Sequence, residues 1–132
     1  MPSARPGWNR FWSRLQQAAW QEVDAVIKGL PLPLRKQAKQ VTVTFEPVPD
    51  AELQADDLPA DTLGLYVGEP YLENACGLEN VPAQIFLFLE NIWAYAGHDT
   101  AAYREEVRIT YLHELGHHLG LDEDDIAMRQ LD

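Results

Sequence analysis

The sequence contains little cysteine, few basic residues and no long hydrophobic run. Its single cysteine, Cys76, cannot form a disulfide within the chain, which is typical of proteins from a reducing compartment. No apolar segment reaches the length of about 20 residues that a membrane-spanning helix needs. Aromatic residues interleave with the N-terminal arginines, and no apolar stretch of a secretion signal follows them. From these absences we expect a cytoplasmic protein.

Positive charge is also scarce, because 10 lysine and arginine residues stand against 21 aspartate and glutamate residues. The net charge of −11 repels the phosphates of DNA and RNA and the acidic lipids of a membrane leaflet. We therefore expect neither nucleic acid nor a membrane as a partner. Hydrophobic residues make up 46% of the 132 residues, which is enough for a core, and this length fits a single domain over residues 1–132.

The hydrophobic patterns predict an α+β fold with a small mixed or antiparallel sheet of about three strands. Helical spacing of apolar residues predicts an N-terminal helix over residues 8–30 that packs on this sheet. Strands are predicted at residues 41–45, 62–67 and 83–90, and irregular connections at 50–61 and 68–82. A glycine inside the second predicted strand, Gly64, indicates close approach of another segment.

A second long helix is predicted over residues 100–119. Asp99 precedes it, and aspartate is a favoured N-cap residue. Four apolar side chains form the expected core stripe of this helix: Ile109, Leu112, Leu115 and Leu119.

The end of this helix carries the chemistry, in the stretch HELGHHLGLDE at residues 113–123. His113 and His117 are four residues apart, which places their Cβ atoms about 5–6 Å apart on one helical face. Imidazoles at this spacing can share one zinc ion, and Glu114 can act as general base on a metal-bound water. His118 lies about 100° further round the helix than His117, so we expect it to pack or to support the site without binding the metal.

A catalytic zinc ion usually has three protein ligands and one open position. Gly120 follows the histidines and can adopt a positive φ, which would end the helix and turn the chain back toward the metal. Acidic residues come directly afterwards, and on spacing alone any of them can be the third ligand: Asp122, Glu123, Asp124 and Asp125.

The pattern HExxHxxGxx followed by an acid resembles that of the zincin superfamily, and in particular the small, single-domain bacterial zincin-like metallopeptidases known as minimal metalloproteases. Residues 63–66, 85–88 and 107–112 are also similar to that family. The resemblance implies that His113, His117 and Glu123 bind Zn²⁺ and that Glu114 is the catalytic base. Family members often carry aspartate where this chain has Glu123. Among the acidic neighbours we rank Asp122 second and Asp124 third.

We therefore expect a zinc metallopeptidase that hydrolyses peptide or related amide bonds, weakly or with help from a partner. Only nine residues follow Glu123, so a second copy or a partner protein is expected to complete the cleft. The strand at Ile85–Leu89 is our predicted edge strand for pairing with an extended peptide. The alternatives are a small-molecule amidase and a metal-binding regulatory or interaction module with little or no peptidase activity. Glu114 favours catalysis, because a structural zinc needs no base.

Hydrolysis of an amide also needs a hydrogen-bond donor for the developing oxyanion, beyond the metal itself. Tyrosine hydroxyls are available donors, although core packing is the favoured interpretation of each tyrosine taken singly. The spacing of residues does not choose among the five phenols of the chain: Tyr66, Tyr71, Tyr95, Tyr103 and Tyr111.

Overall fold

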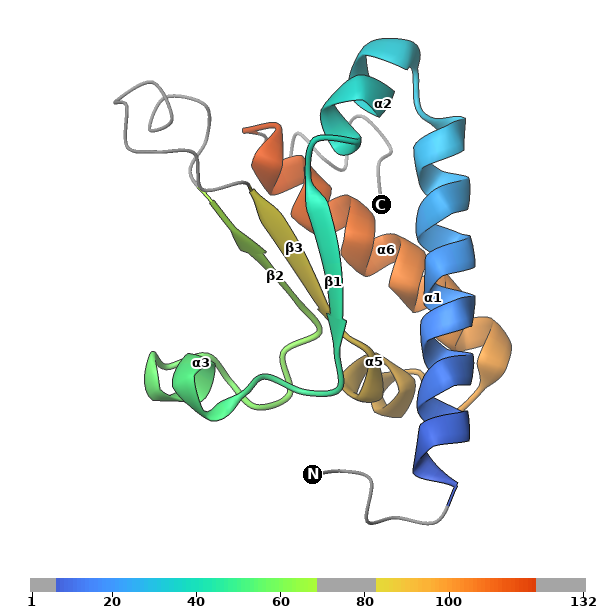
Figure 1. Cartoon of the computed structure of the whole chain (residues 1–132), viewed down its shortest axis with the longest axis vertical. Coiled ribbons are helices and arrows are strands. Elements are labelled where there is room, and N and C mark those ends of the chain that lie inside the picture. The colour runs from blue at the N-terminus through green and yellow to red at the C-terminus, as the bar shows by residue number, and fades with distance from the viewer. Residues whose placement is uncertain (1–6, 69–82, 121–132) are drawn as a thin grey trace.

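The computed structural model describes residues 7–68 and 83–120, which form an α+β fold with a three-stranded mixed sheet (Figure 1). The predicted fold class and the N-terminal helix are confirmed. No helix in the described ranges is both long and apolar enough to cross a membrane. In chain order the elements are α1 (Trp8–Gly29), α2 (Leu32–Ala38), β1 (Thr42–Glu46), α3 (Ala51–Ala55), β2 (Gly64–Val67), β3 (Gln84–Phe88), α5 (Leu89–Tyr95) and α6 (Thr100–His118).

Helix α1 forms where the apolar periodicity predicts it. It ends at Gly29, and the following Leu30 is extended, as expected for a residue that precedes proline. Its sheet-side face is buried over Leu15, Ala18, Ala19 and Val23. The apolar stripe is therefore mainly core, because these side chains lie under the rest of the fold.

The sheet has the strand order β1-β3-β2, with β1 parallel and β2 antiparallel to β3. Ile85 at the centre of β3 stands opposite Val43 on one side and Tyr66 on the other. The prediction that Ile85–Leu89 is an edge strand is therefore wrong, because both sides of β3 already pair with neighbouring strands. Leu89 itself belongs to α5.

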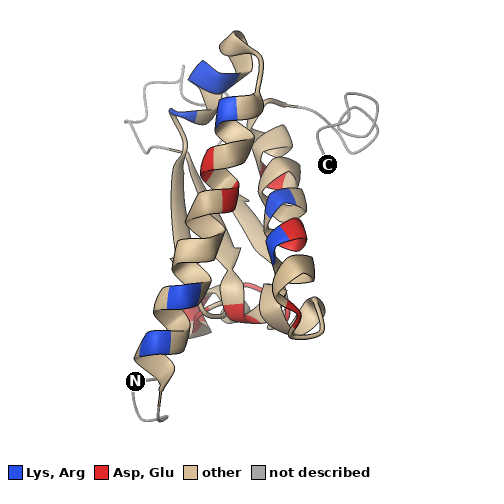
Figure 2. Ribbon diagram, turned by 90° about the vertical axis from the view of Figure 1, so that its right-hand side faces the viewer, with Lys and Arg blue, Asp and Glu red and all other residues tan. Residues whose placement is uncertain are grey.

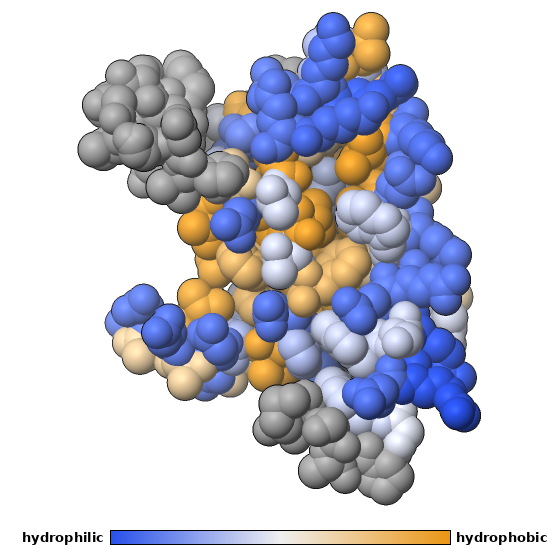
Figure 3. All heavy atoms as spheres, viewed as in Figure 1, coloured by the Kyte–Doolittle hydropathy of each residue, from blue (hydrophilic) through white to orange (hydrophobic). Residues whose placement is uncertain are grey.

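Helices α1 and α6 lie side by side on one face of the sheet, as Figure 2 shows from the helical side. Between the helices and the strands lies the core, which includes the fully buried side chains of Ile85, Leu87 and Val107. On the side of the molecule seen in Figure 3, hydrophobic residues gather over the strands, whereas α1 and α2 present hydrophilic residues. The shared core packs α6 against β2 and β3, and the site depends on this packing.

One segment that was expected to be irregular is partly helical. Within residues 50–61 the chain forms α3, and the Asp50 carboxylate accepts a hydrogen bond of 2.9 Å from the Leu53 backbone N–H. This is the side-chain N-cap that aspartate favours. The loop prediction for residues 51–55 is therefore wrong, since the cap signal at Asp50 outweighs the acidic composition.

Helix α6 begins as predicted, with the Asp99 carboxylate accepting a 2.9 Å hydrogen bond from the Ala102 N–H. Leu115 is buried, and Leu112 and Leu119 pack at the edge of the core. Ile109 is not part of this stripe. It lies one turn before His113 on the same helical face and lines a surface hollow beside it, so that part of the prediction is wrong. The buried stripe of α6 instead includes Tyr103, Val107, Thr110 and Tyr111.

Candidate metal centre

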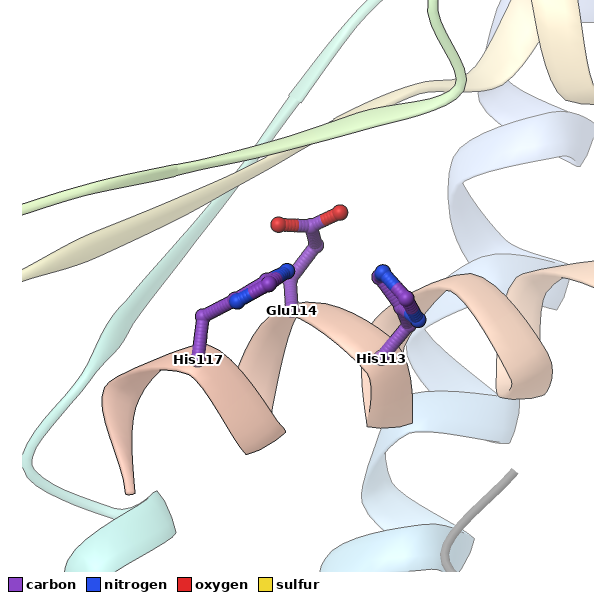
Figure 4. A group of neighbouring side chains, drawn as sticks. All are labelled: His113, Glu114 and His117. Carbon is purple, nitrogen blue, oxygen red and sulfur yellow. The ribbon is translucent and has the colours of Figure 1, made fainter. Parts of the chain in front are cut away.

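Three side chains of the HExxH stretch point from α6 toward β2 (Figure 4). The His113 and His117 rings have centroids 4.9 Å apart and are nearly perpendicular, at 82°. One potential ligand atom from each of His113, Glu114 and His117 lies within 4.8 Å of the others. None of the three side chains is fully exposed. The structure thus brings together two imidazoles and a carboxylate, a donor set that suits a borderline-soft divalent cation such as zinc.

The position of these residues in α6 follows from how the helix begins and ends. Asp99 fixes the start, and the buried stripe, which includes Thr110, packs against the sheet so that the adjoining side of the helix, with both histidines, faces β2. The helix ends at His118, and Gly120 adopts a φ of 76°, as its role in ending the helix predicts. The centre therefore lies near the C-terminal end of α6, where the helix dipole favours a positive charge.

Gly64 lets β2 approach α6 closely beside Glu114. A Cβ atom at position 64 would lie only 2.6 Å from the Thr110 Cγ2 atom and 3.2 Å from the Glu114 Cγ atom. Only a residue without a side chain fits there, so the predicted close approach at Gly64 is confirmed. The glycine backbone forms a wall directly against the proposed catalytic base.

Two hollows meet at Glu114, because Gly64 and Glu114 line both of them. One, of about 420 Å³, follows β2 toward its C-terminal end and includes Tyr66, Gly68 and His117. The other, of about 340 Å³, extends in the opposite direction and includes His113. Together they form an open groove along β2 with the carboxylate at its middle. A larger hollow of about 460 Å³ lies between α1 and the start of α6 and contains none of these three residues.

The tyrosines in the described residues differ in burial, hydrogen bonding and distance from the groove. Tyr103 is buried and donates a 2.8 Å hydrogen bond to the Leu15 carbonyl, and burial raises the pKa of its phenol. Tyr111 is fully buried, and burial raises its pKa to about 12. Tyr95 is 67% exposed at the hollow beside His113. Tyr71 lies outside the described residues.

Tyr66 makes a contact that the sequence did not reveal. Its hydroxyl oxygen lies 3.0 Å from the Nδ1 atom of His118, and the two rings meet edge to face with centroids 5.7 Å apart. Burial lowers the pKa of His118 below its ordinary value. No local spacing signals this pair, because 52 residues separate the partners in the chain.

The predicted third ligand, Glu123, lies outside the described residues, as do its ranked alternatives Asp122 and Asp124. Cys76 does so as well. Within the described ranges, the cluster of His113, Glu114 and His117 is the one group of three potential metal ligands.

Comparison with known proteins extends the result beyond this cluster. The family model for zincin-like metallopeptidases matches residues 38–131, a range that runs from the end of α2 through α6 and beyond it. No curated protein matches the chain.

Proposed function

The chain belongs to the zincin-like metallopeptidase family, and from this premise we propose that it is a zinc-dependent peptidase that cleaves peptide or related amide bonds. One observation carries the proposal: ligand atoms of His113, Glu114 and His117 converge within 4.8 Å at the middle of an open groove. A purely structural zinc site is usually closed by four ligands and needs no carboxylate beside a groove.

His113 and His117 would hold the metal, and Glu123 is our proposed third ligand. When bound, zinc supplies a water of lowered pKa and polarises the substrate carbonyl. The fit is supported by the nearly perpendicular imidazoles, which already lie one turn apart with ring centroids 4.9 Å from each other. Three protein ligands would leave one position for reaction.

Glu114 is the proposed general base. Its side chain lines both halves of the groove, so it would be within reach of both the attacking water and the leaving group. It would accept a proton from the water and then deliver that proton to the departing nitrogen. The backbone at Gly64 packs against this side chain from the side of β2 and so limits the positions that the carboxylate can adopt.

The shape of the groove supports an extended peptide as substrate. Strand β2 pairs with β3 on one side, and within the described residues no strand pairs with its other side. That side is therefore a sheet edge next to the groove, where an extended chain can add as a further strand. This assignment replaces the one at Ile85–Leu89. The groove would then place a backbone amide of the peptide near Glu114.

Substitution of the base tests the function. In Glu114→Gln the helix and both imidazoles remain, so zinc binding should persist while hydrolysis falls by a factor of about 10²–10⁴, the usual contribution of general acid–base catalysis. The measurement is cleavage of a fluorogenic peptide library by zinc-loaded protein, with and without chelator. The exposed Glu105 of the same helix provides a matched control as Glu105→Gln.

Equal rates for the parent and Glu114→Gln would contradict this mechanism. A parent protein that binds zinc but cleaves no member of the library would instead assign the centre to a metal-binding regulatory module.

A further inference from the structure

We propose that Tyr66 donates the hydrogen bond that stabilises the oxyanion of the substrate carbonyl, and that His118 is the positioning residue that holds the phenol. The proposal rests on the proposed peptidase function and adds a donor that this chemistry needs. The cluster on α6 cannot supply one. Its imidazoles are taken up as metal ligands, and the proton that Glu114 accepts is delivered to the departing nitrogen.

The backbone of β2 places the Tyr66 side chain on the side of the centre. Residues two apart in a strand project to the same face, so Tyr66 shares the face of Gly64. That face meets α6, because a Cβ at Gly64 would contact Thr110 and Glu114. The tyrosine therefore extends from β2 on the side of the sheet that faces the metal-binding helix.

The hydroxyl end of Tyr66 borders the groove, and not only its ring. A Cβ atom at Gly68 would lie 3.3 Å from the Tyr66 hydroxyl oxygen. Gly68 lines the same hollow as Glu114 and His117. The phenol oxygen is thus at the wall of the hollow in which the proposed base and one proposed metal ligand lie. A substrate carbonyl bound beside Glu114 and His117 would therefore lie next to the Tyr66 phenol.

His118 fixes where this phenol lies. Its Nδ1 atom is 3.0 Å from the hydroxyl oxygen, and the ring meets the tyrosine edge to face. When Nδ1 carries the proton and donates it to the phenol oxygen, the phenol can in turn donate its own proton to a substrate oxygen. Because His118 follows His117 directly on α6, one rigid helix holds both a metal ligand and the support of the donor. This arrangement limits the movement of the phenol relative to His117.

The other phenols are less suited to this role. Tyr103 already donates to the Leu15 carbonyl, and Tyr111 is fully buried and lines neither hollow of the groove. Tyr95 is the rival, since it borders the hollow beside His113. Its side chain is 67% exposed, so ordering it against a substrate would cost more conformational entropy than using a phenol already held by a histidine.

The test is the affinity of zinc-loaded protein for a phosphinic analogue of an alanine dipeptide, measured by calorimetry. The tetrahedral phosphinate anion places an oxygen where the oxyanion would develop. Tyr66→Phe should weaken its binding about 10- to 100-fold, as expected for loss of one hydrogen bond to a charged group, while zinc affinity stays unchanged. A loss in Tyr95→Phe in place of Tyr66→Phe would assign the donor to the other hollow and overturn the proposal.

The positioning role of His118 has its own readouts. His118→Ala should weaken phosphinate binding, His118→Gln should restore part of it by keeping a donor, and the double variant with Tyr66→Phe should lose little more than either single variant. In metal-free protein, nitrogen NMR should show a protonated Nδ1 in His118 whose shift changes in Tyr66→Phe. The role of His118 would be overturned if the losses of phosphinate affinity in the two single variants were fully additive in the double variant. It would also be overturned if the nitrogen chemical shift of His118 did not change in Tyr66→Phe.

The outcomes distinguish this proposal from the one on which it rests. If the parent itself binds no phosphinate in a zinc-dependent manner, the peptidase function fails and the oxyanion donor fails with it. If the parent binds phosphinate and Tyr66→Phe binds it equally well, only the assignment of the donor is wrong. Melting curves of every variant identify any loss of binding that comes from unfolding.

Discussion

At the scale of single residues, the proposed chemistry depends on two features. One is the spacing of residues within α6, and the other is the set of contacts between α6 and β2, which are distant in the sequence. His113 and His117 could be paired from the sequence because the pitch of a helix places residues four apart on one face. The close approach at Gly64 could be expected, although not its partners Thr110 and Glu114. The Tyr66–His118 contact could not be predicted, since it depends on how a strand is placed over a helix.

Replacement of Gly64 tests this close approach. Gly64→Ala puts a methyl group 2.6 Å from the Thr110 Cγ2 atom, and threonine is stiff at χ1 in a helix, so β2 or α6 must move. We expect the free energy of unfolding to fall by about 1–3 kcal/mol, as for other overpacked cores. Gly29→Ala is the matched control, because a Cβ there meets no atom within 4 Å. Urea unfolding of both variants measures the difference, and equal stabilities would show that Gly64 is not constrained.

At the scale of elements, the position of α6 depends on its attachment to α1. Arg104 and Arg108 of α6 make ion pairs of 2.7 and 2.6 Å with the two carboxylate oxygens of Glu22 on α1. Burial alone would raise the pKa of Glu22, but hydrogen bonds and charge from the two arginines outweigh it and hold the pKa below its ordinary value. The amphipathic pattern predicted both helices. It could not predict the two ion pairs of Glu22 with Arg104 and Arg108, which we call the Glu22 clamp, because 82 and 86 residues separate the partners.

The Glu22 clamp predicts a pH dependence of stability. A carboxyl whose pKa is lower in the folded state contributes stability above its ordinary pKa and loses it as the pH falls through the folded value. Glu22→Gln should therefore reduce the free energy of unfolding at neutral pH, and the difference from the parent should shrink in acid. Asp24→Asn is the control, because its pair with Lys28 is solvent-exposed and worth little. The measurement is the urea midpoint of the parent and each variant, from neutral pH into acid. A stability difference between the parent and Glu22→Gln that does not change with pH would contradict the role of these ion pairs.

At the scale of the whole molecule, element types were largely predictable, whereas arrangement was not. The apolar run of β3 correctly indicated a buried strand, but its central position between β1 and β2 follows from pairings that a one-dimensional pattern does not contain. Only the three-dimensional order shows that β2 is the edge next to α6 and that the groove follows this strand. The cluster of His113, Glu114 and His117 was predictable because all three residues lie in one short helical segment.

Zinc affinity, measured on variants of the proposed ligands, is the most direct test of the proposed metal centre. The parent should bind one zinc ion per chain in competition with a chromophoric chelator. Replacing residues around a metal ligand typically costs 10- to 100-fold in affinity, so loss of a ligand in His113→Ala, His117→Ala or Glu123→Ala should cost more than about 100-fold. His98→Ala, at an exposed histidine beyond the centre, should bind zinc as the parent does. Parent-like zinc affinity in His113→Ala and His117→Ala would show that these two histidines do not hold the metal.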